Sequence, residues 1–185
     1  MSSAPLRRRN GQDPLIGTRE DTAMPHPIVP NLWFDTQAEE AADFYTSLFP
    51  NSRIVSVARY PEGAPGPAGS VMTVEWELNG QRFVGINGGP QFRFTEAVSF
   101  QITCDTQEEL DDYWARLTDG GEEGPCGWCK DRYGLSWQVV PTGMEEFFAD
   151  PDQGRTQRAM QAMFGMKKID IAAMRAAADG VGSPA

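Results

Sequence analysis

The sequence of 185 residues has one histidine, three cysteines and no long apolar run. His26 lies between Pro25 and Pro27, so a multi-histidine metal site is excluded, and a catalytic triad would have to use this single residue. No stretch approaches the roughly 20 apolar residues that cross a bilayer. Three cysteines without a recognisable signal sequence favour a reducing cytoplasm.

Basic residues are also scarce. Lys and Arg total 16 against 26 Asp and Glu, so the formal net charge is −10. Nucleic acids and anionic membranes repel such a surface, and neither is an expected partner. A small-molecule ligand and a second copy of the chain are the expected partners.

The chain contains an internal repeat of strand, helix and three strands. Asp35-Thr36-Gln37 and Asp105-Thr106-Gln107 each follow a strand and precede an acidic first helical turn and an aromatic pair. We expect Asp35 or Thr36 to cap the first helix. Repetition indicates two like modules, each too small to bury its sheet alone. The expected strands are 28–34, 53–60, 71–78 and 82–87 in the first copy, and 97–104, 123–130 and 135–140 in the second.

The predicted organisation is a disordered leader at 1–27, paired modules at 28–89 and 92–141, and a helical extension at 142–180. Helices are expected at 143–149, 155–165 and 168–178. The fold class is therefore α+β, with two βαβββ modules forming a cupped mixed sheet. The extension carries an apolar stripe that indicates either packing or a binding face, made of Met160, Met163, Phe164 and Met166.

Alternation along the strands predicts one face toward the helices and one polar face. The polar face is either a small-molecule pocket or the solvated side of the sheet. Expected toward the helices are Leu32, Phe34, Val74, Trp76, Leu78, Val84, Ile86, Val98, Phe100, Ile102, Trp137 and Val139. Expected on the polar face are Asn31, Trp33, Thr73, Glu75, Glu77, Gly85, Asn87, Ser99, Gln101, Thr103, Ser136 and Gln138.

The candidate site comes from this polar face. If the protein is an enzyme, Glu75 is the expected general base, with Trp33 stacking on the substrate. Asn31, Gln101 and Gln138 would orient a carbonyl or hydroxyl group. The predicted ligand-binding residues are Asn31, Trp33, Asn87, Ser99, Gln101 and Gln138.

The segment CGWCKDRYGLSWQVVP at 126–141 holds two further candidates. Cys126 and Cys129 form a C-x-x-C pair, either redox-active or structural; they lie between short strands and not at a helix start, which favours a structural role. Lys130, Asp131 and Arg132 form either an anion-binding mouth or a solvated turn in which the aspartate accepts from backbone amides.

Four motifs resemble the PhnB-like branch of the vicinal oxygen chelate superfamily, which includes glyoxalase I, bleomycin-resistance proteins and extradiol dioxygenases. They are NGGP at 87–90, FRFTEAVSFQ at 92–101, the segment at 126–141, and DPDQGRTQRAMQAMFGMKKIDIAAMRAA at 150–177. The resemblance covers residues 27–180. It implies paired modules and a cupped sheet, and members often carry the name 3-demethylubiquinone-9 3-methyltransferase. A methyl donor usually binds a Gly-rich loop after a parallel strand, which this sequence lacks, so the name does not predict the reaction.

The resemblance also implies four metal-ligand positions. They fall near Val29 or Asn31, near Gly85 or Asn87, on Ser99 and on Gln138, and only Gln138 is of a type such sites use. Amides and a hydroxyl bind divalent metals weakly, so no cofactor is expected; Glu75 could substitute as a ligand. The predicted function is binding of a small organic molecule without a metal, with or without catalysis. The alternatives are a drug- or metabolite-sequestering protein and a metal-dependent lyase or oxygenase.

Overall fold

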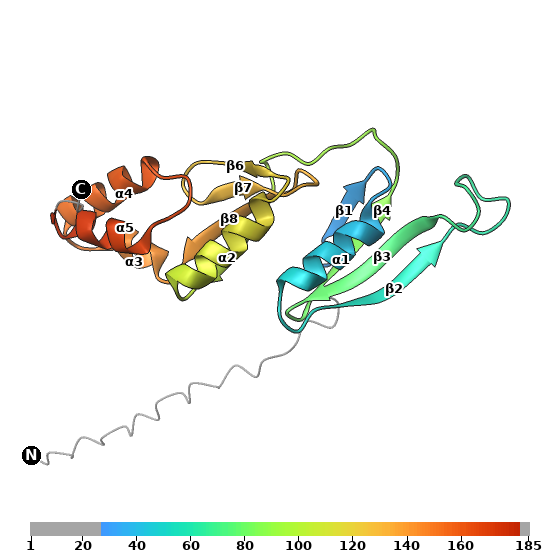
Figure 1. Cartoon of the computed structure of the whole chain (residues 1–185), viewed down its shortest axis with the longest axis horizontal. Helices are drawn as coiled ribbons and strands as arrows, with labels where there is room; N and C mark the ends of the chain where they lie inside the picture. The colour runs from blue at the N-terminus through green and yellow to red at the C-terminus, as the bar shows by residue number, and fades with distance from the viewer. Residues whose placement is uncertain (1–26, 182–185) are drawn as a thin grey trace, which may run out of the picture.

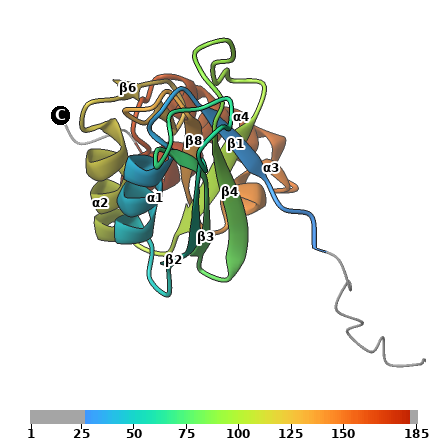
Figure 2. The ribbon, with the colours of Figure 1, turned by 90° about the vertical axis from the view of Figure 1, so that its right-hand side faces the viewer.

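The structure is a computed structural model that describes residues 27–181, so the predicted leader lies outside it apart from Pro27. Two four-stranded sheets stand side by side along the long axis of the molecule (Figure 1). One helix covers each sheet, and both helices lie on the same side (Figure 2). Three short helices follow at the far end of the second sheet. None of the described helices is long and apolar enough to span a membrane.

The first sheet is built from β1 (Asn31–Phe34), β2 (Arg53–Arg59), β3 (Val71–Leu78) and β4 (Gln81–Asn87), with α1 (Ala38–Leu48) between β1 and β2. Its strand order is β1-β4-β3-β2, with β1 parallel to β4 and the other pairs antiparallel. Asn79 and Gly80 have φ angles of 45° and 86°, as a two-residue hairpin turn with two left-handed residues requires.

The second sheet repeats this topology with β5 (Ser99–Cys104), β6 (Glu122–Glu123), β7 (Trp128–Lys130) and β8 (Ser136–Pro141), and with α2 (Gln107–Thr118) after β5. Its order is β5-β8-β7-β6, and β5 runs parallel to β8. The two sheets, the covering helices and the C-terminal helices agree with the predicted α+β fold of paired βαβββ modules.

The two covering helices begin differently. Thr106 caps α2 by accepting from the backbone N–H of Glu109 at 3.2 Å. The corresponding prediction for α1, a cap by Asp35 or Thr36, is wrong. The Ala38 N–H at the start of α1 instead donates to Oδ1 of Asn87 at 2.9 Å, because β1 and β4 pair and bring the end of β4 beside the helix.

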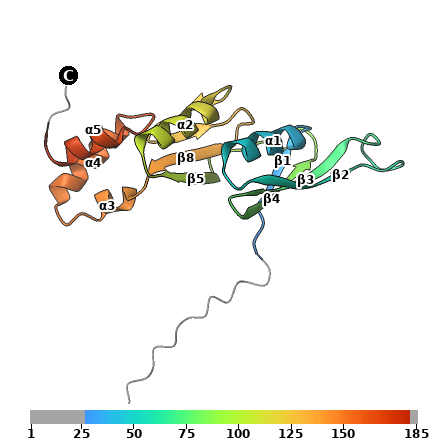
Figure 3. The ribbon, with the colours of Figure 1, turned by 60° about the horizontal axis from the view of Figure 1, so that its bottom comes forward.

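The C-terminal helices are α3 (Met144–Phe148), α4 (Gln153–Phe164) and α5 (Ile171–Ala178). In Figure 3 they continue the long axis beyond the second sheet. Their connection to it is specific: the backbone N–H groups of Cys126 and Gly127 donate to the carbonyls of Met166 and Lys167, at 2.8 and 2.7 Å. The loop between β6 and β7 therefore fixes the segment that joins α4 to α5.

The predicted faces of β4 are wrong by one residue. Trp76 pairs with Phe83 and Val74 pairs with Gly85, and cross-strand partners face the same side. A Cβ on Gly85 would lie 2.8 Å from the Trp76 ring, so this position faces α1. Consequently Val84 and Ile86 face away from the helices, whereas Gly85 and Asn87 face toward them. The two-residue turn after β3 sets this register.

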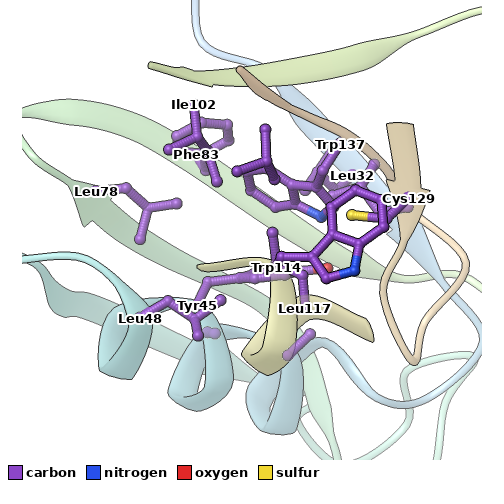
Figure 4. Packing of buried hydrophobic residues seen from close by; sticks show 14 of the residues in the cluster. Leu32, Tyr45, Leu48, Leu78, Phe83, Ile102, Trp114, Leu117, Cys129 and Trp137 are labelled. Atoms are coloured by element: carbon purple, nitrogen blue, oxygen red, sulfur yellow. The ribbon is translucent and has the colours of Figure 1, made fainter. Parts of the chain in front are cut away.

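An aromatic layer joins the two modules. Phe83 and Phe100 meet at a ring-centroid distance of 5.3 Å, and Phe49 stacks on Tyr113 at 5.4 Å. Figure 4 shows buried side chains of both sheets and both helices in one cluster. The two modules therefore share one core. Each large side chain buried in it contributes about 1.5–3 kcal/mol to stability.

The carboxylate of Asp131 lies within this layer and is almost wholly buried. Its Oδ2 accepts from the Tyr45 hydroxyl at 2.8 Å and from the Trp137 indole at 2.9 Å. Its Oδ1 accepts from the backbone N–H groups of Tyr133 and Leu135 at 2.9 and 3.1 Å. Burial raises the pKa of Asp131, and these four donors partly oppose that effect. Acceptance from backbone amides by Asp131 is thus confirmed, but the prediction of a solvated turn is wrong for this residue, because its carboxylate is buried between α1 and β8 and joins them.

Replacing this carboxylate with an amide tests its role. Asp131→Asn keeps the shape but turns an NH₂ group toward one pair of donors, so we expect a loss of about 2–4 kcal/mol in the free energy of unfolding. Urea unfolding measures the loss. Tyr45→Phe removes a single donor and is the control, with an expected cost of about 1 kcal/mol. Equal costs for the two variants would contradict a central role for Asp131.

Candidate functional site

The faces that α1 and α2 leave uncovered carry six of the seven predicted site residues. Asn31, Trp33 and Glu75 lie on the open face of the first sheet, in the rows that contain Val84 and Ile86. On the second sheet Ser99, Gln101 and Gln138 lie on the corresponding face. Among the described residues no hydrogen bond joins the first group to the second. The structure thus divides these predicted site residues into two groups, one on each sheet, which we call the first and second half-sites of the predicted site.

The second half-site is the better assembled one. Gln138 donates from Nε2 to the Ser99 hydroxyl at 2.9 Å, and Gln101 is the register partner of Gln138. In the first half-site, Asn31 donates to the carbonyl of Val29 at 3.0 Å, a local contact. Trp33 donates to the carbonyl of Gly89 at 2.9 Å, which fixes its indole against the loop after β4.

Two predicted residues have structural partners. Asn87 faces the helices and not the open face: its oxygen caps α1, and its Nδ2 donates to the carbonyl of Val71 at 3.1 Å. Glu75 accepts a hydrogen bond from Arg82 on the neighbouring strand, and 38% of its side chain is exposed. An exposed carboxylate paired with arginine lacks the burial that makes a carboxylate an effective base at neutral pH.

A cavity of about 620 Å³ lies against the open face of the second sheet. Trp128, Lys130 and Ser136 contribute from β7 and β8, and Met163 and Phe164 contribute from α4. The remaining wall comes from the acidic edge and loop around β6, from one further residue of β7 and from one residue of the connection between the modules: Glu122, Glu123, Gly124, Pro125, Cys126, Cys129 and Glu96. The size and mainly apolar side chains suit a small organic molecule.

Ser136 gives this cavity an unsatisfied polar group. The residue is fully buried, and its hydroxyl has no hydrogen-bond partner in the part of the chain that the structure describes. An unpaired buried hydroxyl costs about 1–3 kcal/mol, so native proteins rarely leave one without a reason. A ligand with a hydrogen-bonding group would satisfy it.

Lys130 lies at the edge of the cavity between two carboxylates. Its Nζ lies 2.6 Å from Oε1 of Glu96, and Glu122 is its register partner on β6. The hydrogen bond to Glu96 is the main cause of the raised pKa of Lys130, and the charge of Glu122 adds to it. This lysine therefore remains protonated and already has a counterion.

A second cavity of about 420 Å³ adjoins the first and lies between the modules. Glu122 and Lys130 line both cavities. The second one is more polar, and Trp33 is the predicted site residue that it includes. Its other lining residues come from the end of β1, from the connection between the modules and from the turn before β8: Phe34, Asp35, Gln37, Pro90, Phe92, Arg93, Phe94, Arg132, Tyr133 and Gly134.

The residues at the four metal-ligand positions do not fit a divalent metal. They offer amides and a hydroxyl, Asn87 is occupied by backbone groups, and Ser99 and Gln138 are bonded to each other. Within residues 27–181 no group of three His, Cys, Asp or Glu side chains could hold a metal ion. Divalent metals prefer carboxylate, imidazole or thiolate ligands, so the donor set is chemically unsuitable.

The C-x-x-C pair has the geometry of a structural element. Cys129 pairs with Trp137 on the side that faces the helices, and both cysteines are among the residues that line the first cavity. Burial raises the pKa of Cys129 to about 12, so its thiolate is scarce at neutral pH. The structural alternative for this pair is the one that the geometry favours.

The sequence-based prediction missed most of the residues that line the first cavity. Trp128 and Lys130 lie in a strand of three residues, too short for a clear alternation of faces. The sequence places Met163 and Phe164 in a stripe with a packing or a binding role; Met163 packs partly against the core, whereas Phe164 is 63% exposed. The signal in the sequence was the aromatic and methionine content of α4.

Comparison with known proteins identifies relatives. The profile of a family described as 3-demethylubiquinone-9 3-methyltransferase matches residues 26–140. A solved structure titled as a putative 3-demethylubiquinone-9 3-methyltransferase, PhnB protein, from Bacillus cereus is 40% identical; the match covers 63% of this chain and 100% of that chain, with a TM-score of 0.58. Protein PA1353 from Pseudomonas aeruginosa is 19% identical over 62% of this chain and 96% of its own, with a TM-score of 0.52. No curated protein matches the chain.

Proposed function

Because the chain belongs to the 3-demethylubiquinone-9 3-methyltransferase family, in the PhnB-like branch of the vicinal oxygen chelate superfamily, we propose that it uses the family's paired modules to bind a small organic molecule. The binding site is the cavity of about 620 Å³ on the open face of the second sheet. The observation that carries this proposal is the buried, unpaired hydroxyl of Ser136 in a cavity with apolar walls. Ser99, Gln101 and Gln138 extend the polar part of the same face.

The proposal includes a homodimer. The open face of the first sheet presents Trp33, Val84 and Ile86, all half-buried. Among the described helices, α1 packs on this sheet and lies on its other face, whereas Phe92 of the connection between the modules packs against the Trp33 ring. If the first sheet of a second copy faced this site, Asn31, Trp33 and Glu75 would complete a cup. Apolar strips on a sheet face are commonly buried by a symmetric partner. The three free cysteines suit a reducing cytoplasm.

We propose binding and no particular reaction. The name of the family refers to methyl transfer, but the turns after β1 and β5 are both Asp-Thr-Gln, without the glycines that approach a nucleotide-like methyl donor. Glu75 is paired with Arg82, so general-base catalysis has little support. Sequestration of a metabolite or drug requires only the cavity, and it is the form of the proposal that uses the fewest assumptions.

A fluorescent probe tests the cavity. The neutral dye N-phenyl-1-naphthylamine should bind the wild-type protein with enhanced emission, and Met163→Trp should weaken its binding at least about tenfold because the larger ring fills the cavity. Met160→Trp is the matched control, since Met160 lies on the same helix but lines a different groove. Equal affinity for both variants, or no binding by the wild type, would contradict the proposed site.

The dimer is tested by a charge on the open face of the first sheet. Wild-type protein should sediment as a dimer, and Ile86→Glu should shift it to monomer because an unpaired charge is costly in a buried interface. Val57→Glu, on an exposed position of β2, should leave the dimer intact. Circular dichroism checks that both variants fold. A monomeric wild type, or unchanged association of the Ile86 variant, would refute this arrangement.

Metal content is the third test. The chemistry of the donor set supports a function without a divalent cation, so protein dialysed against buffer without chelator should contain far less than one equivalent of Zn, Ni, Mn or Fe by mass spectrometry. Near-stoichiometric metal that survives dialysis would overturn this part of the proposal. Native mass spectrometry on the same sample would show whether an organic molecule copurifies.

A further inference from the structure

The residues that line the first cavity, of about 620 Å³, carry more negative than positive charge. Three of its lining residues are glutamates and one is a lysine. Lys130 is paired with Glu96, and Glu123 is paired with Lys167 at 3.1 Å and accepts from the Trp114 indole. The side chain of Glu122, an exposed residue, has no hydrogen bond or ion pair within residues 27–181. Once these pairs are formed, one carboxylate at the cavity is therefore left without a counterion.

Glu122 belongs to a polar row that crosses three strands. It is the register partner of Lys130 on β7, and Lys130 is the partner of Ser136 on β8. Register partners lie on the same face, and neighbouring strands are about 4.8 Å apart, so Glu122 and Ser136 lie about 10 Å from each other. These three strands thus carry an unpaired carboxylate on β6 and an unpaired buried hydroxyl on β8, and Ser99 on β5 continues the row beyond Ser136.

Apolar side chains flank this row. Trp128 precedes Lys130 on β7 by two residues and faces the same side, and Met163 and Phe164 contribute from α4. The two residues of α4 lie beyond residue 140, where the match to the family profile ends. This part of the wall therefore comes from the C-terminal extension of the chain. An aromatic body between the indole and these side chains would be covered on both sides.

From this arrangement we infer that the ligand is an amphipathic cation: an apolar, preferably aromatic body with a protonated amine that pairs with Glu122. This inference rests on the proposed function, since it names the chemical class of ligand for the same cavity. A group that hydrogen-bonds to Ser136 at the opposite end would complete the fit. The net charge of −10 attracts such a cation from solution.

The competing class is an anion bound to Lys130. Such a ligand would have to displace Glu96, which lies 2.6 Å from the lysine, and it would then face Glu96 and Glu122 together. Arg93 and Arg132 line only the adjoining cavity, and Arg132 is paired with Asp119 at 2.7 Å. A cation requires no such displacement, because Glu122 is already unpaired.

Three probes with one aromatic body separate the classes: 1-naphthylmethylamine, 1-naphthylmethanol and 1-naphthoic acid. Each would compete with N-phenyl-1-naphthylamine for the wild-type protein at pH 7. We expect the amine to bind roughly fivefold more tightly than the alcohol, and the acid to bind most weakly. The advantage of the amine should shrink as salt is added, since its origin is electrostatic.

Variants assign this preference to one residue. Glu122→Gln should remove the advantage of the amine and leave the affinity for the alcohol unchanged, and Glu122→Lys should make the acid the preferred probe. Glu108→Gln changes the net charge equally from an exposed position on α2, and it should change nothing.

The outcomes separate the two proposals. If the alcohol binds but the amine has no advantage, or if Glu122→Gln preserves that advantage, the assignment of a cation is wrong and the binding cavity stands. If neither the dye nor any of the three probes binds the wild-type protein, the proposed function fails, and this inference fails with it.

Discussion

The buried carboxylate of Asp131 is the constraint on which the rest of the fold depends. It accepts a hydrogen bond from α1 of the first module, through Tyr45, and from β8 of the second, through Trp137. A buried charge without partners would be costly, so the two elements must stay together for the carboxylate to remain satisfied. The aromatic layer around it then excludes water and strengthens each of these hydrogen bonds. Two sheets without a hydrogen bond between them thereby behave as one core.

This arrangement buries one face of each sheet under a helix. Both helices lie over the shared core, so the opposite faces of the two sheets are open. These two open faces differ in how much of the chain covers them. The C-terminal extension reaches the second sheet, where Met163 and Phe164 help to enclose a cavity. The first sheet has no comparable cover, and Trp33 and Ile86 remain half-exposed there. This asymmetry is the physical basis for proposing a ligand on one face and a second copy against the other.

The polar groups among the predicted site residues favour ligand binding over catalysis. Gln138 and Ser99 satisfy each other, Asn87 caps a helix, and Glu75 is bonded to Arg82. None of them has the burial or the strong ligand character that general-base or metal catalysis requires. Ser136 differs, because its hydroxyl is buried and has no partner among the described residues. A hydrogen bond between this hydroxyl and a ligand would fix the orientation of the ligand in the cavity.

Local patterns in the amino-acid sequence were enough to predict the repeat, the element types, the two-residue turn after β3 and the membership of the family. These features depend on local periodicity, on turn residues and on motif spacing, all of which a single chain displays without knowledge of its contacts. The face of Gly85 followed from the turn register, yet alternation counted along β4 alone gave the wrong answer.

The roles of Asn87, Asp131 and Ser136 became evident from the folded chain and not from its sequence. Asn87 caps a helix that lies 49 residues earlier in the chain, and Asp131 bonds to a tyrosine 86 residues away. The cavity is lined by residues of β7, β8 and α4, and no local sequence pattern indicates that α4 lies over that face. Such contacts arise from pairings between distant segments, whose energies depend on the whole packed core. A sequence therefore specifies which groups can bind, whereas the fold determines which of them remain free to do so.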